Sequence, residues 1–296
     1  MKIPSCHICP RGCGVPRQEE EYSAGFCGMP GSAVAARAAL HFGEEPCISG
    51  QNGSGTVFFS GCSLRCRFCQ NAPISHDKFG RPISAFRLAS IFRELVEAGA
   101  HNINLVNPTH FVPSILEALR LYRPPVPLVY NSSGYERLET LRLLDGVIDV
   151  YLPDLKYMDG ALASSLSGAE NYPLYATEAI LEMARQTGPM VLDEDGIALR
   201  GTMVRHLVLP GYTHSSKEVL DWMAGHLPSG VWVSLMFQYT PVRELPEHPS
   251  LNRTLTRREC DKIWSYLVDK GLTDGYVQEP GSNGVQFIPA FDLTGI

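Results

Sequence analysis

Short β-rich runs alternate with segments of helical periodicity along most of this chain. The β-rich runs are residues 56–60, 102–107, 126–130, 147–152, 203–209 and 231–237, with residues 274–277 as a candidate closing strand. The helical segments are residues 84–98, 112–122, 136–144, 177–186, 217–226 and 256–270. Such alternation predicts parallel β/α units. Six units predict an α/β fold, a partial β/α barrel, whose chemistry is expected at the carboxyl ends of the strands.

The first 50 residues differ from this pattern. They are rich in Cys, Gly and Pro and contain no long periodic segment, which is typical of an irregular segment held together by a metal. Residues 50–55 have the composition of a turn or short linker. We therefore expect two parts, a Cys-rich metal-binding extension at residues 1–50 and the partial barrel at residues 51–296.

Composition and charge narrow the classes of protein. The 296 residues are 44% hydrophobic and 19% charged, which indicates a globular chain rather than a disordered one. A net charge of −6 is not that of a general nucleic-acid binder, and no apolar run approaches the roughly 18 residues of a membrane span. Because the sequence starts without an apolar signal core, its nine cysteines indicate metal or redox chemistry in the cytoplasm rather than disulfides.

Three cysteines lie within eight residues directly after the first β-rich run, at Cys62, Cys66 and Cys69. Soft thiolates favour iron–sulfur clusters, zinc or copper(I). A four-iron cluster on three thiolates leaves one iron open to another ligand, much as a catalytic zinc keeps an open position. The alternative is a zinc site whose fourth ligand is distant in the sequence.

The spacing Cys62-x3-Cys66-x2-Cys69, with the aromatic Phe68 before the last cysteine, resembles the signature of the radical S-adenosylmethionine superfamily. The resemblance implies a 4Fe–4S cluster whose open iron chelates the amino and carboxylate groups of S-adenosyl-L-methionine. In that superfamily an electron from the reduced cluster cleaves the sulfonium to methionine and a 5′-deoxyadenosyl radical, which abstracts a hydrogen atom from the substrate. The resemblance also implies an electron donor, such as a flavodoxin or ferredoxin.

The ends of the later β-rich runs resemble those of the glycyl-radical-enzyme activases, the group that includes the activating enzyme of pyruvate formate-lyase. Many members of the superfamily carry a Gly-Gly-Glu-like segment after the second strand, which holds the amino group of S-adenosylmethionine. This chain lacks that motif and has Asn-Pro-Thr-His at residues 107–110 instead. Either Asn107 or Thr109 is the candidate to accept the hydrogen bond there.

Two further strand ends extend the resemblance. Residues 131–135 are similar to the activases' Asp-Thr-Asn-Gly-aromatic text, with Asn131 in place of an Asp that helps to hold a cation and Ser133 as a further candidate contact. After the fourth run, Asp154-Leu-Lys156 matches the activases' Asp-x-Lys. Lys156 is a point charge suited to the carboxylate of S-adenosylmethionine.

The fifth and sixth runs complete the comparison. Residues 205–211 resemble an Arg-aromatic-Val-Val-Val-Pro-Gly text of the activases, and Arg205 is suited to clamp a carboxylate with two parallel hydrogen bonds. At the end of the sixth run, Gln238 or Tyr239 occupies the place of a ribose-contacting His in the activases. The resemblance therefore implies one cofactor site assembled from successive strand ends.

A second group of cysteines, Cys6, Cys9, Cys13 and Cys27, precedes the barrel. Four thiolates suffice to close a zinc or a 4Fe–4S site without another ligand. The segment resembles the start of proteins described as activase-like. Two roles remain open, an auxiliary cluster that relays electrons or contacts substrate, and a zinc knuckle that stabilises the extension.

Three functions follow from these features. The first is a radical S-adenosylmethionine oxidoreductase, similar to the pyruvate formate-lyase-activating enzyme, that converts a backbone Gly of a partner glycyl-radical enzyme to a radical. The second is radical modification of a peptide or a small molecule. The third is a non-catalytic electron carrier or structural metal protein, which would need neither six β/α units nor an open iron.

Overall fold

A mostly parallel sheet forms the centre of the protein. The structure is a computed structural model that describes residues 2–278 and 289–296. Residues 279–288 of the predicted barrel lie outside the described part. The strand order is β10-β9-β8-β6-β5-β4-β2-β1-β3. The strands that pair in parallel are β2 (Ser54–Phe59), β4 (Ile103–Val106), β5 (Leu128–Ser132), β6 (Val150–Pro153), β8 (Ala198–Leu207), β9 (Trp232–Met236) and β10 (Gly275–Val277). The α/β fold with a mostly parallel sheet is confirmed, and β10 coincides with the candidate closing strand at residues 274–277. The partial barrel of six units stays a prediction.

Three antiparallel strands complete the sheet. They are β1 (Ala33–His41), which pairs with β2, β3 (Arg81–Ile83), which pairs with β1, and β7 (Val191–Leu192), which pairs with β8. β1 lies in the stretch that was expected to be irregular. Its first four residues, Ala33 to Ala36, are almost fully buried, and a strand buried on both faces lacks the alternation that marks a strand in a sequence. The boundary at residue 50 stays a prediction.

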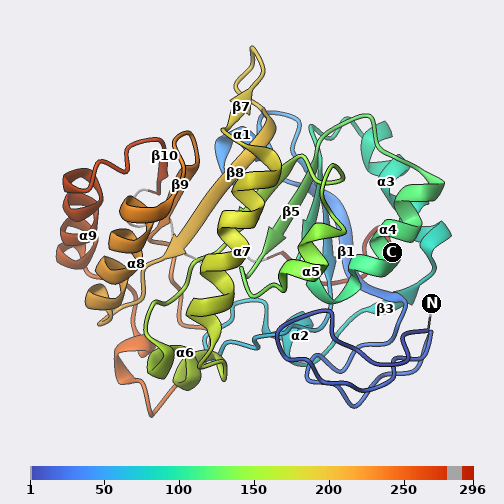
Figure 1. The fold of residues 1–296 in the computed structure, drawn as a ribbon, viewed down its shortest axis with the longest axis horizontal. Helices are drawn as coiled ribbons and strands as arrows, with labels where there is room; N and C mark the ends of the chain where they lie inside the picture. Colours follow the sequence, from blue (N-terminus) through green and yellow to red (C-terminus); the bar gives the residue numbers. More distant parts are fainter. Residues whose placement is uncertain (1, 279–288) are drawn as a thin grey trace.

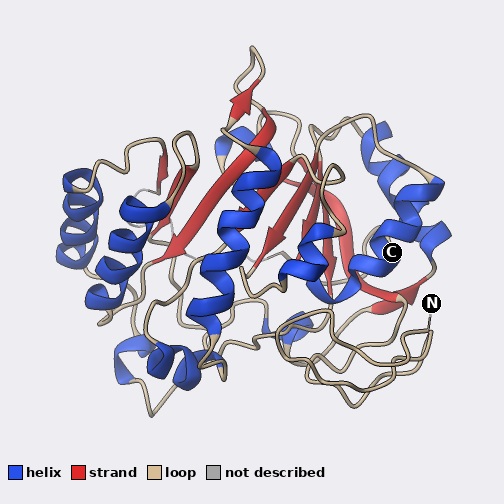
Figure 2. Ribbon diagram, in the orientation of Figure 1, coloured by secondary structure: helices blue, strands red, loops and turns tan. Residues whose placement is uncertain are grey.

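The helices lie around the sheet, as Figures 1 and 2 show. They are α1 (Pro46–Ser49), α2 (Ala72–Ser75), α3 (Ala85–Glu97), α4 (Val112–Leu121), α5 (Leu138–Arg142), α6 (Gly160–Ser167), α7 (Tyr172–Thr187), α8 (Thr213–His226) and α9 (Arg257–Asp269), with 3-10 turns η1 (Thr109–Phe111) and η2 (Pro249–Asn252). None of the helices in the described ranges combines the length and the apolar character that crossing a bilayer requires.

Local sequence signals explain where the longer helices begin. The hydroxyl of Ser84 accepts a hydrogen bond from the backbone N–H of Arg87 (3.1 Å) and so caps α3. α9 starts with a capping box, in which Thr256 and Glu259 each bond the other's backbone N–H. The apolar stripe of α3, which includes Leu88 and Leu95, is buried against the sheet.

The carboxyl ends of the strands meet the irregular parts of the chain. In Figure 1 the arrowheads of β5 and β8 point toward the lower edge, where α2, α6 and the amino-terminal segment lie. In Figure 2 this edge consists mainly of loops. A functional site built from strand ends is therefore expected at this edge.

Candidate functional site

A cavity of about 240 Å³ lies at the carboxyl ends of the parallel strands. Twelve of the residues that the sequence predicts line it: Cys62, Cys66, Phe68, Cys69, Asn107, Asn131, Ser133, Asp154, Lys156, Arg205, Gln238 and Tyr239. They come from the ends of six different strands, because parallel strands with aligned ends bring residues distant in sequence to one edge. The resemblance and the strand-end rule thus point to a single place in the fold.

The three cysteines of this site lie on the loop that follows β2. Each accepts a hydrogen bond, Cys62 from the Leu64 N–H (3.3 Å), Cys66 from the Ser167 hydroxyl (3.0 Å) and Cys69 from the Ser75 hydroxyl (3.3 Å). Burial raises the pKa of the Cys66 thiol to about 12, so a metal must displace its proton. In the described ranges no three His, Cys, Asp or Glu side chains are arranged to hold a metal ion, and ligation by these cysteines stays a prediction.

Asp154 and Lys156 form a buried ion pair directly after β6. Lys156 Nζ lies 2.5 Å from Asp154 Oδ2. Burial alone would raise the pKa of Asp154, but Lys156 and Arg205 outweigh it and hold that pKa below its usual value. The same pairing, together with nearby Cys66, keeps the pKa of Lys156 above its usual value despite burial. Both groups are therefore charged at neutral pH.

Arg205 joins this pair to a carboxylate that the sequence did not single out. Its Nε donates to Asp154 Oδ1 (3.0 Å), and its two terminal nitrogens donate to Glu44 Oε2 (3.1 Å) and Asn131 Oδ1 (2.5 Å). Glu44 Oε1 accepts from Asn131 (3.1 Å) and from Asn104 (3.1 Å). Burial raises the pKa of Glu44 to about 7, despite Arg205. Asp154, Lys156 and Arg205 are thus the charged groups of the cavity, whereas Glu44 is only partly ionised at neutral pH.

Glu44 escaped prediction because it follows β1 rather than the carboxyl end of a parallel strand. The antiparallel pairing of β1 with β2 brings the end of β1 beside Ser54, at the opposite end of β2 from the cysteine loop. Glu44 nevertheless lines the same cavity. No local motif marks this residue in the sequence.

Two polar groups of the cavity have no partner within the described protein. The Ser133 hydroxyl and Asn71 Oδ1 are buried, and neither makes a hydrogen bond. Buried polar atoms are rarely left unpaired in a folded protein. Unpaired hydroxyl and amide oxygens in the same cavity as three thiols are suited to a polar organic ligand beside a thiolate-bound cluster.

Phe68, Gln238 and Tyr239 form a further part of the wall. The rings of Phe68 and Tyr239 lie 6.1 Å apart, and the Tyr239 hydroxyl donates to the backbone oxygen of Leu251 (2.8 Å). The Gln238 carboxamide accepts a hydrogen bond from Gln278 (3.0 Å). Tyr239 is therefore held in place, and both candidate ribose contacts lie at the cavity.

Thr109 is the predicted residue that the structure does not bring to the cavity. Asn107 adopts a positive φ of 58° and donates through its amide to the backbone oxygen of Gly61. The chain then turns into η1, and the Thr109 hydroxyl donates to Glu136 Oε1 (2.6 Å) in the interior. Of the two alternatives at this strand end, Asn107 is the one that lines the cavity.

Glu136 predicts a specific pH dependence of stability. Burial raises its pKa from 4.5 to about 7. The folded protein binds the Glu136 proton more tightly than the unfolded chain does. The protonated carboxyl therefore contributes to the free energy of unfolding in full below about pH 4.5, and this contribution is lost as the pH rises through about 7. We expect urea unfolding to show that Glu136→Gln removes on the order of 2 kcal/mol of the decline in stability between pH 5 and pH 8. An unchanged pH dependence in the variant would contradict this assignment.

The four cysteines of the amino-terminal segment are free thiols, and three of them, Cys6, Cys9 and Cys27, are buried. Cys13 accepts a hydrogen bond from the backbone N–H of Phe26 (3.3 Å). Burial raises the pKa of Cys9 to about 12. Metal binding by this set stays a prediction.

Arg11 attaches this segment to the cysteine loop. It donates to the backbone oxygens of Ser63 (2.7 Å), Ser167 (3.0 Å) and Gly168 (2.5 Å). Its guanidinium also lies over the ring of Phe26, 3.8 Å from the centroid. The extension therefore contacts both the loop between Cys62 and Leu64 and the end of α6.

Replacing Arg11 with alanine is expected to loosen this attachment. The variant removes three charge-assisted hydrogen bonds, so we expect the free energy of unfolding to fall by about 2 kcal/mol. Urea unfolding measures that loss, and limited proteolysis is expected to cleave residues 2–32 faster. Arg120→Ala, on the exposed end of α4, is the control. Equal proteolysis of the two variants would show that Arg11 does not hold the segment.

Comparisons with known proteins agree with this architecture. No protein-family model matches the chain. A radical SAM methyltransferase from Sphaerobacter thermophilus has a TM-score of 0.52 at 17% identity, over 79% of this chain and 68% of that protein. Streptococcus suis SuiB bound to S-adenosylmethionine gives a TM-score of 0.49 at 13% identity over 74% of this chain, which spans about half (48%) of SuiB.

The likeness to the methyltransferase shows that the chain shares the fold of that protein. The uncharacterized protein MJ0674 of Methanocaldococcus jannaschii is 33% identical over 87% of this chain and 72% of its own length. The chain therefore belongs to the same protein family as MJ0674.

Proposed function

We propose that this protein is a radical S-adenosylmethionine enzyme of the activase-like type. The observation that carries the proposal is that one cavity contains both the three-cysteine loop and the charged ends of β6 and β8. Bound there, a 4Fe–4S cluster and S-adenosylmethionine would supply one electron and a 5′-deoxyadenosyl radical, with methionine as the other product. The chain's own residues would bind and orient the cofactor and exclude water.

The charges of the cavity suggest how the cofactor would be oriented. Lys156 and Arg205 carry the positive charges suited to its carboxylate. Asn107 and the unpaired Ser133 hydroxyl offer hydrogen bonds to its amino and hydroxyl groups. Gln238 or Tyr239 would contact the ribose. Asn131, where the activases have an Asp, is held by Glu44 and Arg205, which supports a role in positioning Arg205 rather than in holding a cation.

The substrate we propose first is a partner glycyl-radical enzyme, on the resemblance of the Asp154-x-Lys156 and Arg205 strand ends to the activases. Radical modification of a peptide or a small molecule is the alternative. A flavodoxin or ferredoxin would supply the electron, and the exposed iron of such a cluster needs reducing surroundings, as in the cytoplasm. A stoichiometric glycyl-radical signal in the partner supports the first substrate, whereas repeated turnover of a small molecule supports the second.

The amino-terminal cysteines extend the proposal to a second metal site. Either a 4Fe–4S cluster or a zinc ion would satisfy four thiolates. Anaerobic iron and zinc counts on the full chain and on a Cys9→Ala, Cys13→Ala variant would distinguish them, because only the metal of this segment is expected to fall.

Reconstitution tests the proposed activity directly. The protein is loaded anaerobically with iron and sulfide, reduced, and given S-adenosylmethionine. We expect release of 5′-deoxyadenosine and methionine in equal amounts. A protein that takes up a full cluster and releases neither product is a carrier or structural protein, and the proposal fails.

A further inference from the structure

The last turn of α6 lies against the cysteine loop, although nothing in the sequence marks α6 as part of the site. The Ser167 hydroxyl donates to Cys66 Sγ (3.0 Å), and the Arg67 N–H donates to the Leu166 oxygen (2.8 Å). Ser167 is 2% exposed and Cys66 is 7% exposed. Ser167 and Cys66 are 101 positions apart in the chain.

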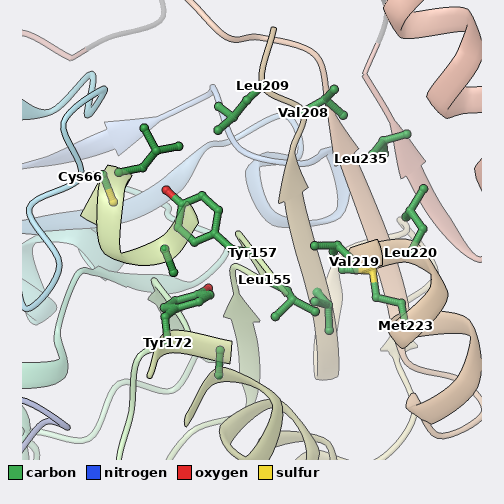
Figure 3. Packing of buried hydrophobic residues seen from close by; sticks show 14 of the residues in the cluster. Cys66, Leu155, Tyr157, Tyr172, Val208, Leu209, Val219, Leu220, Met223 and Leu235 are labelled. Atoms are coloured by element: carbon green, nitrogen blue, oxygen red, sulfur yellow. The ribbon is translucent and has the colours of Figure 1, made fainter. Parts of the chain in front are cut away.

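Tyr157 approaches the same pair from the loop after β6. Its hydroxyl lies 3.0 Å from Ser167 Oγ, its side chain is fully buried, and Figure 3 shows the hydroxyl directed toward Cys66. A phenolic hydroxyl can donate one hydrogen bond. Since Ser167 has one hydrogen and gives it to Cys66, its oxygen accepts from Tyr157. The two hydroxyls form a relay from Tyr157 through Ser167 to the sulfur.

Among the described residues, the other two cysteines of the loop have no comparable pair of hydroxyls. Cys62 accepts from a backbone N–H. The Ser75 hydroxyl near Cys69 also lies 2.8 Å from Nδ1 of His76. Because His76 Nε2 donates to the Arg65 carbonyl oxygen (3.1 Å), Nδ1 is an acceptor that competes for the single hydrogen of Ser75. Ser167 is therefore the side-chain donor committed to one cysteine of the loop.

We infer that Tyr157 and Ser167 are positioning residues that raise the reduction potential of the cluster held by Cys66. This inference rests on the proposed function. When the cluster gains an electron, negative charge on its thiolates grows, so a hydrogen bond to a thiolate stabilises the reduced form more than the oxidised form. In a chain of hydrogen bonds each donor polarises the next, so Tyr157 strengthens the bond from Ser167.

A potentiometric titration of the anaerobic holoprotein, followed by electron paramagnetic resonance, tests the relay. The signal followed is the one that S-adenosylmethionine alters, which separates it from any cluster on the amino-terminal cysteines. We expect Ser167→Ala to lower the reduced-to-oxidised ratio at a fixed potential about fivefold, or ~40 mV for a one-electron couple. Tyr157→Phe is expected to lower it by less, and Ser167→Thr, which keeps the hydroxyl, to retain the wild-type potential.

Ser165→Ala is the matched control, because Ser165 lies on the same helix and its hydroxyl pairs with His248 (3.0 Å) instead of a cysteine. A Ser167→Ala protein with a full cluster and the wild-type potential overturns the relay. If Ser167→Ala loses its cluster, the reduction potential of Tyr157→Phe is the test instead. A wild-type potential in Tyr157→Phe overturns the inference. A wild-type protein without a signal sensitive to S-adenosylmethionine overturns the proposed function, whereas an unshifted potential in otherwise active variants overturns the relay alone.

Discussion

Replacing Cys66 with alanine is expected to abolish release of 5′-deoxyadenosine from S-adenosylmethionine. Cys66 is buried in the cavity wall and accepts the Ser167 hydrogen bond. The two remaining thiolates are too few to bind a 4Fe–4S cluster, so the open iron that would bind the cofactor is absent as well. The expected activity is that of the iron-free protein, measured by chromatography of the products after anaerobic reconstitution.

Cys260→Ala provides the control for this variant. Cys260 is also a buried free thiol, but it lies on α9, and it is absent from the cavity lining. We expect this control to keep its cluster and its activity. A Cys66→Ala protein that cleaves S-adenosylmethionine as fast as Cys260→Ala would contradict the assignment of Cys66 as a cluster ligand.

The second large effect is expected from Arg205→Ala. Arg205 is the cation shared by Asp154 and Glu44, and all three side chains are 16% exposed or less. Removing one member of a buried ionic network leaves unpaired charge and typically costs 3–5 kcal/mol, so we expect the free energy of unfolding to fall by about 3 kcal/mol. Arg205→Lys is expected to recover part of this loss, because an ammonium keeps the charge but not the fork of donors.

Urea unfolding measures this effect, and Arg200→Ala is the matched control. Arg200 lies on the same strand, β8, but its side chain is exposed and makes one long hydrogen bond of 3.5 Å. Its removal is expected to change stability by less than about 0.5 kcal/mol. Equal losses in the two variants would show that the buried network does not depend on Arg205. Binding of S-adenosylmethionine to the holoprotein is also expected to weaken in Arg205→Ala.

Much of the candidate site follows from the sequence, because of one geometric rule. Parallel strands present their carboxyl ends at one edge, so Asp154, Lys156 and Arg205 come together although other strands and helices separate them in the chain. The same rule places the cysteine loop beside them. A parallel strand that is recognised by its β-rich composition therefore also predicts that the residue following it lies at the carboxyl edge of the sheet.

The parts that escaped prediction do not belong to strand ends. Glu44 reaches the cavity through the antiparallel strand β1, whose run of small apolar residues has no alternating pattern. Ser167 belongs to α6, a short helix without strong amphipathic periodicity. Thr109 follows a strand end as predicted, but the positive φ of Asn107 and the turn η1 direct it into the interior. Backbone turns and tertiary contacts of this kind leave no mark in a single sequence.

The proposed function requires that three thiolates hold a cluster with one iron open to S-adenosylmethionine. The most direct test is electron paramagnetic resonance of the reduced, reconstituted protein before and after S-adenosylmethionine is added, with Cys9→Ala, Cys13→Ala protein to remove any second cluster. We predict that the cofactor changes the spectrum, because its amino and carboxylate groups bind the open iron. A full cluster whose spectrum does not respond would show that the fourth iron already has a protein ligand, and the proposed binding of S-adenosylmethionine to that iron would be wrong.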